Sequence, residues 1–111
     1  MRNVMEQTDA LINAIHGSNE YIQYQMLLND VRKNESVYQC LNVYRQRNFE
    51  IQMKNQIDSI EASARLNQEF QDILTRTDVK EFLAVEQRYL KMIRKMNQKI
   101  DSQIHVNIDF M

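Results

Sequence analysis

Apolar side chains recur at steps of three and four along most of the chain, most regularly from Asp78 to about Ile104. The apolar members of that stretch are Val79, Phe82, Leu83, Tyr89, Leu90, Ile93, Met96, Ile100 and Ile104. This spacing is the repeat of one helix face. It predicts a helix of roughly 27 residues, about 40 Å long at 1.5 Å per residue. Asp78, with Glu81 three residues later, predicts a capping box at its start. A helix that is apolar along such a length needs other helices packed beside it.

Two shorter helices are predicted at the start of the chain. The first runs from about Asn3 to Ile15, and its inner face is Val4, Thr8, Leu11, Ile12 and Ile15. Gly17 follows, at the position where a left-handed residue commonly ends a helix. Ser18 predicts the N-cap of the second helix, which runs to about Val31. Its inward residues are Tyr21, Tyr24, Leu27, Leu28 and Val31.

The stretch that begins at the predicted cap Asn34 carries two apolar stripes on different sides of one helix. The first stripe is Val37, Cys40, Leu41, Tyr44 and Ile51, and the second is Phe49, Met53, Ile57 and Ile60. If the helix runs straight, the second stripe needs another set of neighbours, and we expect a homo-oligomer with this stripe at the interface. If the chain instead bends near residues 55–59, the stripe can return to the same core. The sequence leaves both alternatives open.

A fourth helical stripe follows the break predicted at residues 58–61. It consists of Ala62, Leu66, Phe70, Ile73 and Leu74 and ends near Arg76. With one glycine and no proline in 111 residues, the chain lacks the turn residues of sheet-containing folds. We predict a single all-α domain over residues 1–111. It should be an elongated antiparallel helical bundle of about four to five helices with a long C-terminal helix.

Composition excludes several functions. A phosphate-binding P-loop or a dinucleotide fingerprint needs two or more glycines at fixed spacing. The longest apolar run has four residues, from Phe82 to Val85, which predicts no membrane span. No apolar leader follows Met1, so we expect no signal peptide. A single cysteine, Cys40, rules out an intrachain disulfide and fits a reducing cytoplasm.

The sequence offers no constellation for catalysis, a cofactor or a metal. His16 and His105 are far apart, and neither has a glutamate three residues before it, so the Glu-x-x-His signature of carboxylate-bridged metal sites in helical bundles is missing. No His/Cys cluster has zinc-ligand spacing. Cys40 lies on an apolar stripe and is predicted to be a core residue rather than a nucleophile. We therefore predict a protein that is not an enzyme.

Two polar features of the final helix are candidates for function. Glu86 falls inside the apolar arc, where an unpaired carboxylate would be costly. It should either find an Arg, Lys, Tyr hydroxyl or helix N-terminus, or lie at a splayed helix end and reach water. On the opposite arc lies a basic surface formed by Arg88, Lys91, Arg94, Lys95 and Lys99. The net charge is −1 for the whole chain and +1 from Asp78 to Met111, so tight nucleic-acid binding is not expected.

The segments Ser18–Tyr24 and Phe82–Ile93 resemble two segments of the YlbF/YmcA family of small bacterial helical proteins. The first is Ser18-Asn19-Glu20-Tyr21-Ile22-Gln23-Tyr24, which is similar to that family's Ser-x-Glu-Tyr segment between the first helices. The second is Phe82-Leu83-Ala84-Val85-Glu86-Gln87-Arg88-Tyr89-Leu90, followed by Met92-Ile93, which is similar to the family's closing helix. The order of elements agrees over nearly the whole chain. The chain departs from the pattern in lacking the Pro and Gly that often surround the central turns.

The resemblance implies a cytoplasmic, self-associating protein with no catalytic residues. Relatives in Gram-positive bacteria regulate competence, sporulation and biofilm formation, and some join a complex that directs ribonuclease Y in messenger-RNA maturation. The cysteines linked to an iron–sulfur cluster in some members have no counterpart near this C-terminus, so no cofactor is implied.

The leading hypothesis is a regulatory or adaptor protein acting through helix–helix interfaces. Its partners would be further copies of itself and proteins of an RNA-processing complex. The interface would be the Phe49 stripe or the surroundings of Glu86. The alternative is a helical nucleic-acid-associated protein that uses the basic surface.

Overall fold

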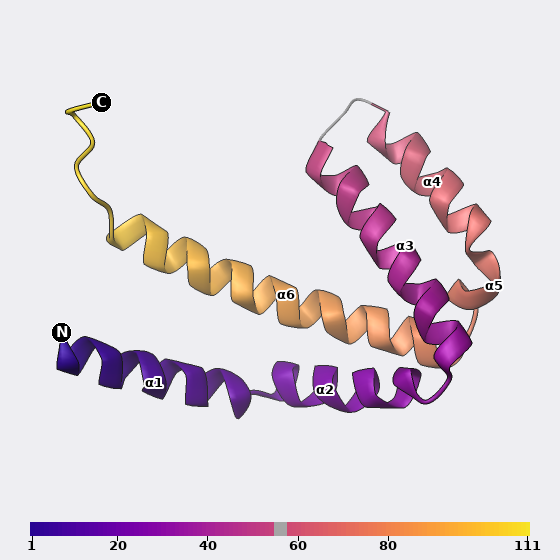
Figure 1. The fold of residues 1–111 in the computed structure, drawn as a ribbon, viewed down its shortest axis with the longest axis horizontal. Helices are drawn as coiled ribbons and strands as arrows, with labels where there is room; N and C mark the ends of the chain where they lie inside the picture. The colour runs from indigo at the N-terminus through magenta and orange to yellow at the C-terminus, as the bar shows by residue number, and fades with distance from the viewer. Residues whose placement is uncertain (55–57) are drawn as a thin grey trace.

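The computed structural model describes residues 1–54 and 58–111, and every regular element in these ranges is a helix (Figure 1). The helices are α1 (Arg2–His16), α2 (Asn19–Arg32), α3 (Glu35–Lys54), α4 (Ser59–Glu69), α5 (Gln71–Leu74) and α6 (Thr77–Gln103). The principal extents of 50 × 36 × 18 Å make the molecule long and flat. The predicted all-α, elongated fold with a long C-terminal helix is confirmed.

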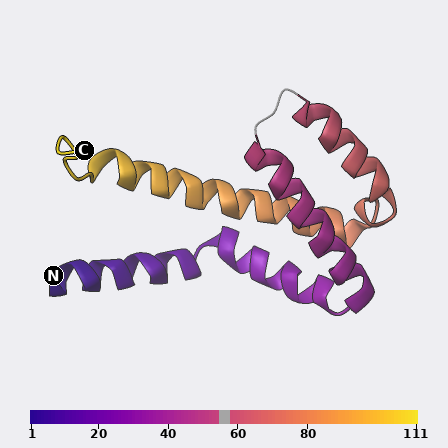
Figure 2. The same ribbon diagram turned by 45° about the horizontal axis from the view of Figure 1, so that its top comes forward.

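Two antiparallel pairings organise the helices. α1 and α2 follow one another along the length of α6 and run in the opposite direction (Figures 1 and 2). α3 and α4 form a second pair that projects from the end of the molecule where α6 begins. An ion pair of 2.8 Å from Arg47 Nη1 to Glu69 Oε1 joins α3 to α4, and the Arg47 guanidinium lies 5.5 Å from the centre of the Phe70 ring.

α3 ends at Lys54 and α4 begins at Ser59. The two helices lie side by side and run in opposite directions, so the chain reverses direction between these residues. Of the two alternatives for this region, the bend is therefore the one observed. Residues 55–57, which include Ile57 of the second stripe, lie outside the described part of the chain.

The core lies where α2, α3, α4 and α5 meet the first third of α6. Its buried members are Leu28, Val31, Leu41, Tyr44, Leu66, Ile73, Val79 and Phe82. The inward faces predicted for α2 and α3 are confirmed, since Leu28, Val31, Leu41 and Tyr44 are buried, with Cys40 packed against them. The predicted fourth stripe also supplies the core, although it is split at Phe70 into α4 and the short α5.

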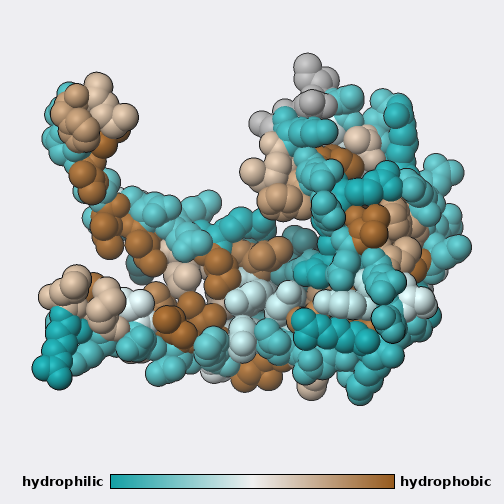
Figure 3. All heavy atoms as spheres, in the orientation of Figure 1, coloured by the Kyte–Doolittle hydropathy of each residue, from teal (hydrophilic) through white to brown (hydrophobic). Residues whose placement is uncertain are grey.

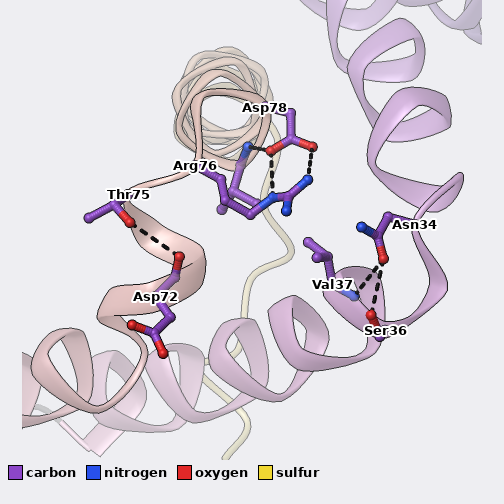
Figure 4. A network of polar contacts seen from close by, with 8 residues as sticks. Asn34, Ser36, Val37, Asp72, Thr75, Arg76 and Asp78 are labelled. Atoms are coloured by element: carbon purple, nitrogen blue, oxygen red, sulfur yellow. Dashed lines mark hydrogen bonds and ion pairs between the residues drawn. The ribbon is translucent and has the colours of Figure 1, made fainter.

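The polar residues expected to start helices act as predicted in two places. The Ser18 hydroxyl accepts the Tyr21 N–H at 3.2 Å and caps α2. The Asn34 carboxamide oxygen accepts the Val37 N–H at 3.3 Å at the start of α3 (Figure 4). Because these side chains satisfy backbone donors that have no partner within the helix, they fix where α2 and α3 begin.

Two predictions about helix ends are wrong. Gly17 does end α1, but with φ −89° and ψ −2°, so the left-handed conformation predicted for it does not occur. Asp78 is not the N-cap of α6, because the helix begins one residue earlier and Arg76 is its N-cap. Both carboxylate oxygens of Asp78 instead accept hydrogen bonds from Arg76, at 3.1 and 3.2 Å (Figure 4). This fork occupies the carboxylate that the capping box would have required.

The prediction that one face of α1 packs inward is also wrong within a single copy of the chain. α1 contains no buried residue. Val4, Leu11 and Ile12 are 60%, 38% and 43% exposed. The periodicity of α1 is genuine, but none of the helices that the structure describes covers its apolar face.

Candidate interaction surfaces

Glu86 is buried and paired with Arg45 of α3. Its side chain is 11% exposed and that of Arg45 is 28% exposed, and Arg45 Nη2 donates directly to the Glu86 carboxylate. Arg45 also donates through Nη1 to Asn42 Oδ1 at 3.0 Å and through Nη2 to the Tyr24 hydroxyl at 3.5 Å. Of the two alternatives for Glu86, the structure therefore shows the partnered one, and the pair joins α3 to α6 beside α2.

The surroundings of this pair favour the charged form of Arg45. Burial by itself lowers the pKa of Arg45, but the hydrogen bond and the charge of Glu86, with the Tyr24 hydroxyl, raise it above its ordinary value. The guanidinium also lies 5.1 Å from the centre of the Phe82 ring, where a cation is attracted to the ring face. The positive charge of Arg45 on α3 is thus stabilised by side chains of α2 and α6.

A line of neighbouring aromatic rings, stacked at Tyr24 and edge-on or tilted at Tyr21, continues from Phe82 to the joint between α1 and α2. Ring centres are 5.7 Å apart for Tyr24 and Phe82, 5.0 Å for Tyr24 and Tyr89, 5.7 Å for Tyr21 and Tyr89, and 4.8 Å for His16 and Tyr21. Aromatic pairs at these separations contribute about 0.5–1.5 kcal/mol each beyond area burial. The line connects the core with the end of α1.

A groove of about 520 Å³ lies above the pair, between α3 and α6. Arg45 and Glu86 contribute to its lining together with Tyr24, Phe49, Leu83 and Leu90. The groove therefore joins the two parts of the predicted partner site, the Phe49 stripe and the Glu86 surroundings. The sequence did not indicate that Arg45 would line this groove. An arginine that follows the inward-facing Tyr44 is expected to point into solvent.

The described members of the Phe49 stripe stay exposed although the chain bends. Phe49 and Met53 of α3 are 61% and 68% exposed, and Ile60 of α4 is 83% exposed. The bend thus does not return these three side chains to the core. We call them the α3 surface.

A larger apolar surface covers the opposite end of the molecule. It consists of Val4, Met5, Leu11 and Ile12 of α1, Ile100 of α6 and Ile104 just after α6, all 38% exposed or more. Val106, Ile108, Phe110 and Met111 of the C-terminal tail are exposed as well. Figure 3 shows these apolar patches along α1, the end of α6 and the tail. We call α1 with the last two turns of α6 the arm. Sequence spacing placed Val4, Leu11, Ile12, Ile100 and Ile104 on faces expected to pack against other helices.

All five residues of the predicted basic surface lie on α6 and are exposed: Arg88, Lys91, Arg94, Lys95 and Lys99. None of them forms an ion pair with another described residue. Residues 88–103 contain these five cations and a single carboxylate, Asp101, for a net charge of +4. The other acidic residues of α6, Asp78, Glu81 and Glu86, lie before this half, so the net charge of the whole segment concealed its strongly basic half.

Other chemistry is sparse in the part of the chain that the structure describes. Residues 1–54 and 58–111 contain no group of three or more His, Cys, Asp or Glu arranged to hold a metal ion. Cys40 is half-buried and packs against the core, as expected for a structural cysteine. No helix among the described residues is both long enough and apolar enough to cross a membrane.

Comparison with known proteins gives two matches. Residues 4–105 match the protein family described as "Control of competence regulator ComK, YlbF/YmcA". A protein of Caldicellulosiruptor bescii named "UPF0342 protein" is 26% identical over 108 residues, which covers 94% of this chain and 90% of that protein. No solved structure gives a significant match.

Proposed function

This chain belongs to the YlbF/YmcA family, which is described as a control of the competence regulator ComK, and on that premise we propose that it regulates through helix–helix contacts with other protein chains and not through catalysis. One observation carries the proposal: α1 is strongly amphipathic and contains no buried residue. Fully burying a Val, Leu or Ile side chain contributes roughly 1.5–3 kcal/mol. A helix with such a face needs a partner, and extended apolar patches commonly mark interfaces.

The arm is the self-association surface in this proposal. Its apolar residues recur at helical spacing on both α1 and α6, so two copies can pack their arms as a four-helix arrangement. Thr8 does not interrupt the face, because its hydroxyl donates to the Val4 carbonyl at 2.8 Å. The α3 surface and the adjoining groove remain available at the far end for a different chain.

The test compares the molecular mass in solution of two variants, one altered in the arm and one altered on the α3 surface. Leu11→Lys with Ile12→Lys places two charges in the arm, and we expect the oligomer to shift to the mass of one chain in light scattering after size exclusion. Phe49→Lys with Met53→Lys makes the same change in charge on the α3 surface and serves as the matched control. Because all four side chains are exposed, helix content should persist in both variants.

A wild type that elutes with the mass of one chain would contradict self-association. If only the Phe49/Met53 variant falls to the mass of one chain, the interface between copies lies instead on the α3 surface, as the sequence suggested.

For the second chain we propose a protein of an RNA-processing complex that acts on ribonuclease Y, which is the partner that the family resemblance implies. Its docking place is the α3 surface with the groove over Arg45 and Glu86. The Phe49/Met53 variant should then retain the dimer but lose its effect on cleavage of a messenger-RNA substrate by purified ribonuclease Y with its accessory proteins. Equal cleavage with wild type and variant would contradict this part of the proposal.

A further inference from the structure

We propose that the seam between α2 and α6 is a second docking groove, which binds an amphipathic helix bearing carboxylates from a partner protein. Two hollows lie on this seam and share Arg88. One, of about 330 Å³, is lined mainly by apolar groups, among them Met26, Leu27, Ala84 and Val85. The other, of about 390 Å³, is lined by Glu20, Arg88, Lys91, Met92 and Lys95.

The basic hollow continues into a straight row of cations. Arg88, Lys91, Lys95 and Lys99 follow at steps of three, four and four, so they lie on one side of α6 and span about 16 Å. All four are exposed, and no described carboxylate lies within ion-pair distance of them. Two carboxylates line the seam: Glu20 lines the basic hollow and Glu81 lines the apolar one. The row therefore has unused positive charge.

The apolar hollow lies beside exposed side chains of α2. Ile22 and Met26 are one helical turn apart and are 52% and 56% exposed. From Ala84 to Lys91 and Lys95 the distance along α6 is about 10 to 16 Å. A ligand that uses both hollows must carry an apolar group and negative charges at that separation.

A helix meets this requirement directly. An apolar residue on one turn, followed by carboxylates about seven and eleven positions later, places both kinds of group on one face at the same axial repeat as α6. Docking of an amphipathic helix into a groove is a common mode of recognition. Single-stranded RNA fits less well, because its recognition also uses aromatic side chains that stack on bases, and no aromatic ring lines either hollow.

Apart from Lys99, which lies in the last two turns of α6, the groove is distinct from the surfaces of the proposed function. It involves neither the exposed residues of α1 nor the α3 surface, so its test gives a separate result. The probe is a fluorescein-labelled helical peptide of about 18 residues with two leucines one turn apart and glutamates two and three turns beyond them. The matched peptide has glutamine in place of each glutamate. Fluorescence anisotropy measures binding at about 0.05 M and about 0.5 M salt, because charge pairing at the surface is screened at the higher value.

Lys91→Glu with Lys95→Glu should weaken binding of the glutamate peptide at least tenfold. Lys33→Glu with Lys54→Glu makes the same change in net charge at exposed positions outside the groove and should leave binding unchanged. Met26→Gln should weaken binding at both salt concentrations, because it alters the apolar hollow. Far-UV circular dichroism checks that each variant remains helical.

Four results would overturn the proposal. The first is the absence of saturable binding by the glutamate peptide, and the second is equal binding of the glutamine peptide. The third is tighter binding of an oligouridylate than of the peptide, which would assign the row to nucleic acid. The fourth is a loss of dimer mass in the Lys91/Lys95 variant, which would assign the groove to a second copy of the chain.

Discussion

The two ends of α6 carry the same apolar repeat in opposite surroundings. Near its start, Val79 and Phe82 are completely buried against α2, α3 and α5. Near its end, Ile100 is 38% exposed although it continues the same face, and Ile104, which directly follows the helix, is 70% exposed. α1 behaves like the distal end of α6, and α2 like the proximal one. A sequence repeat thus reports that a face requires a partner, but not whether the partner lies in the same chain.

The comparison predicts that stability resides almost entirely in the proximal end. Phe82→Ala should lower the free energy of unfolding by about 3–5 kcal/mol, because it removes a fully buried ring and leaves a cavity. Urea denaturation followed by circular dichroism measures the change. Phe110→Ala, in the C-terminal tail beyond the distal end of α6, is the matched control. Phe110 is 80% exposed, so its loss should alter stability by less than about 0.5 kcal/mol. A similar loss of unfolding free energy in the two variants would refute the prediction that stability resides in the proximal end.

The buried ion pair should give the next largest effect. Arg45→Met leaves Glu86 without its partner, and we expect a loss of about 2–3 kcal/mol. This is below the 3–5 kcal/mol typical of a fully buried pair, since Arg45 retains some exposure. Adding Glu86→Leu removes the stranded carboxylate and should restore most of the stability. If the double variant is no more stable than Arg45→Met, the unpaired charge is not the cause of the loss.

The arm should show its dependence on a second chain in hydrogen exchange. At low protein concentration the amides of α1 should exchange quickly, because no buried contact holds the helix, while those of α2 remain protected. Raising the concentration should slow exchange in α1 by roughly tenfold or more, equivalent to about 1.4 kcal/mol. In the Leu11→Lys, Ile12→Lys variant, exchange in α1 should not depend on protein concentration. Exchange in α1 that is independent of concentration in the wild type would argue against burial of α1 between copies.

The smallest expected effect concerns the start of α6. The hydrogen bonds from Arg76 hold the pKa of the Asp78 carboxyl below its usual range. A depressed pKa in the folded state stabilises the fold above the unfolded-state pKa, near 4, and that contribution disappears as the pH falls through the folded-state value. With a side chain 38% exposed, the contribution should be only a few tenths of a kcal/mol. Asp78→Asn should therefore destabilise slightly at pH 7 and have no effect near pH 2. An equal loss at both values would exclude the charge as its origin.

Several features of the fold could be predicted because each rests on local chemistry. Ser18 and Asn34 offer oxygens to nearby backbone donors whatever surrounds them, and the inward faces of α2 and α3 follow from spacing alone. Asp78 shows the limit of this reasoning, because Arg76 competes for the same carboxylate.

The candidate surfaces were less predictable because they depend on which helices meet. Arg45 gave no signal in the sequence, since its role requires α3 to cross α6 at Glu86. The exposure of Phe49 and Met53 likewise follows from where α4 packs after the bend. The basic half of α6 could have been found from a shorter charge window, which would have separated Arg88 to Lys99 from the acidic residues before them.

The joint between α1 and α2 makes α1 a lever. Gly17 has a near-helical backbone, so the departure from one continuous helix is concentrated at Ser18, whose ψ is 150°. α1 is about 22 Å long, and a rotation of about 10° at such a joint displaces its tip by up to about 4 Å. The ring contact between His16 and Tyr21 spans the joint at 4.8 Å and therefore resists this swing. A substitution at Tyr21 would change the direction of α1 without touching its apolar face.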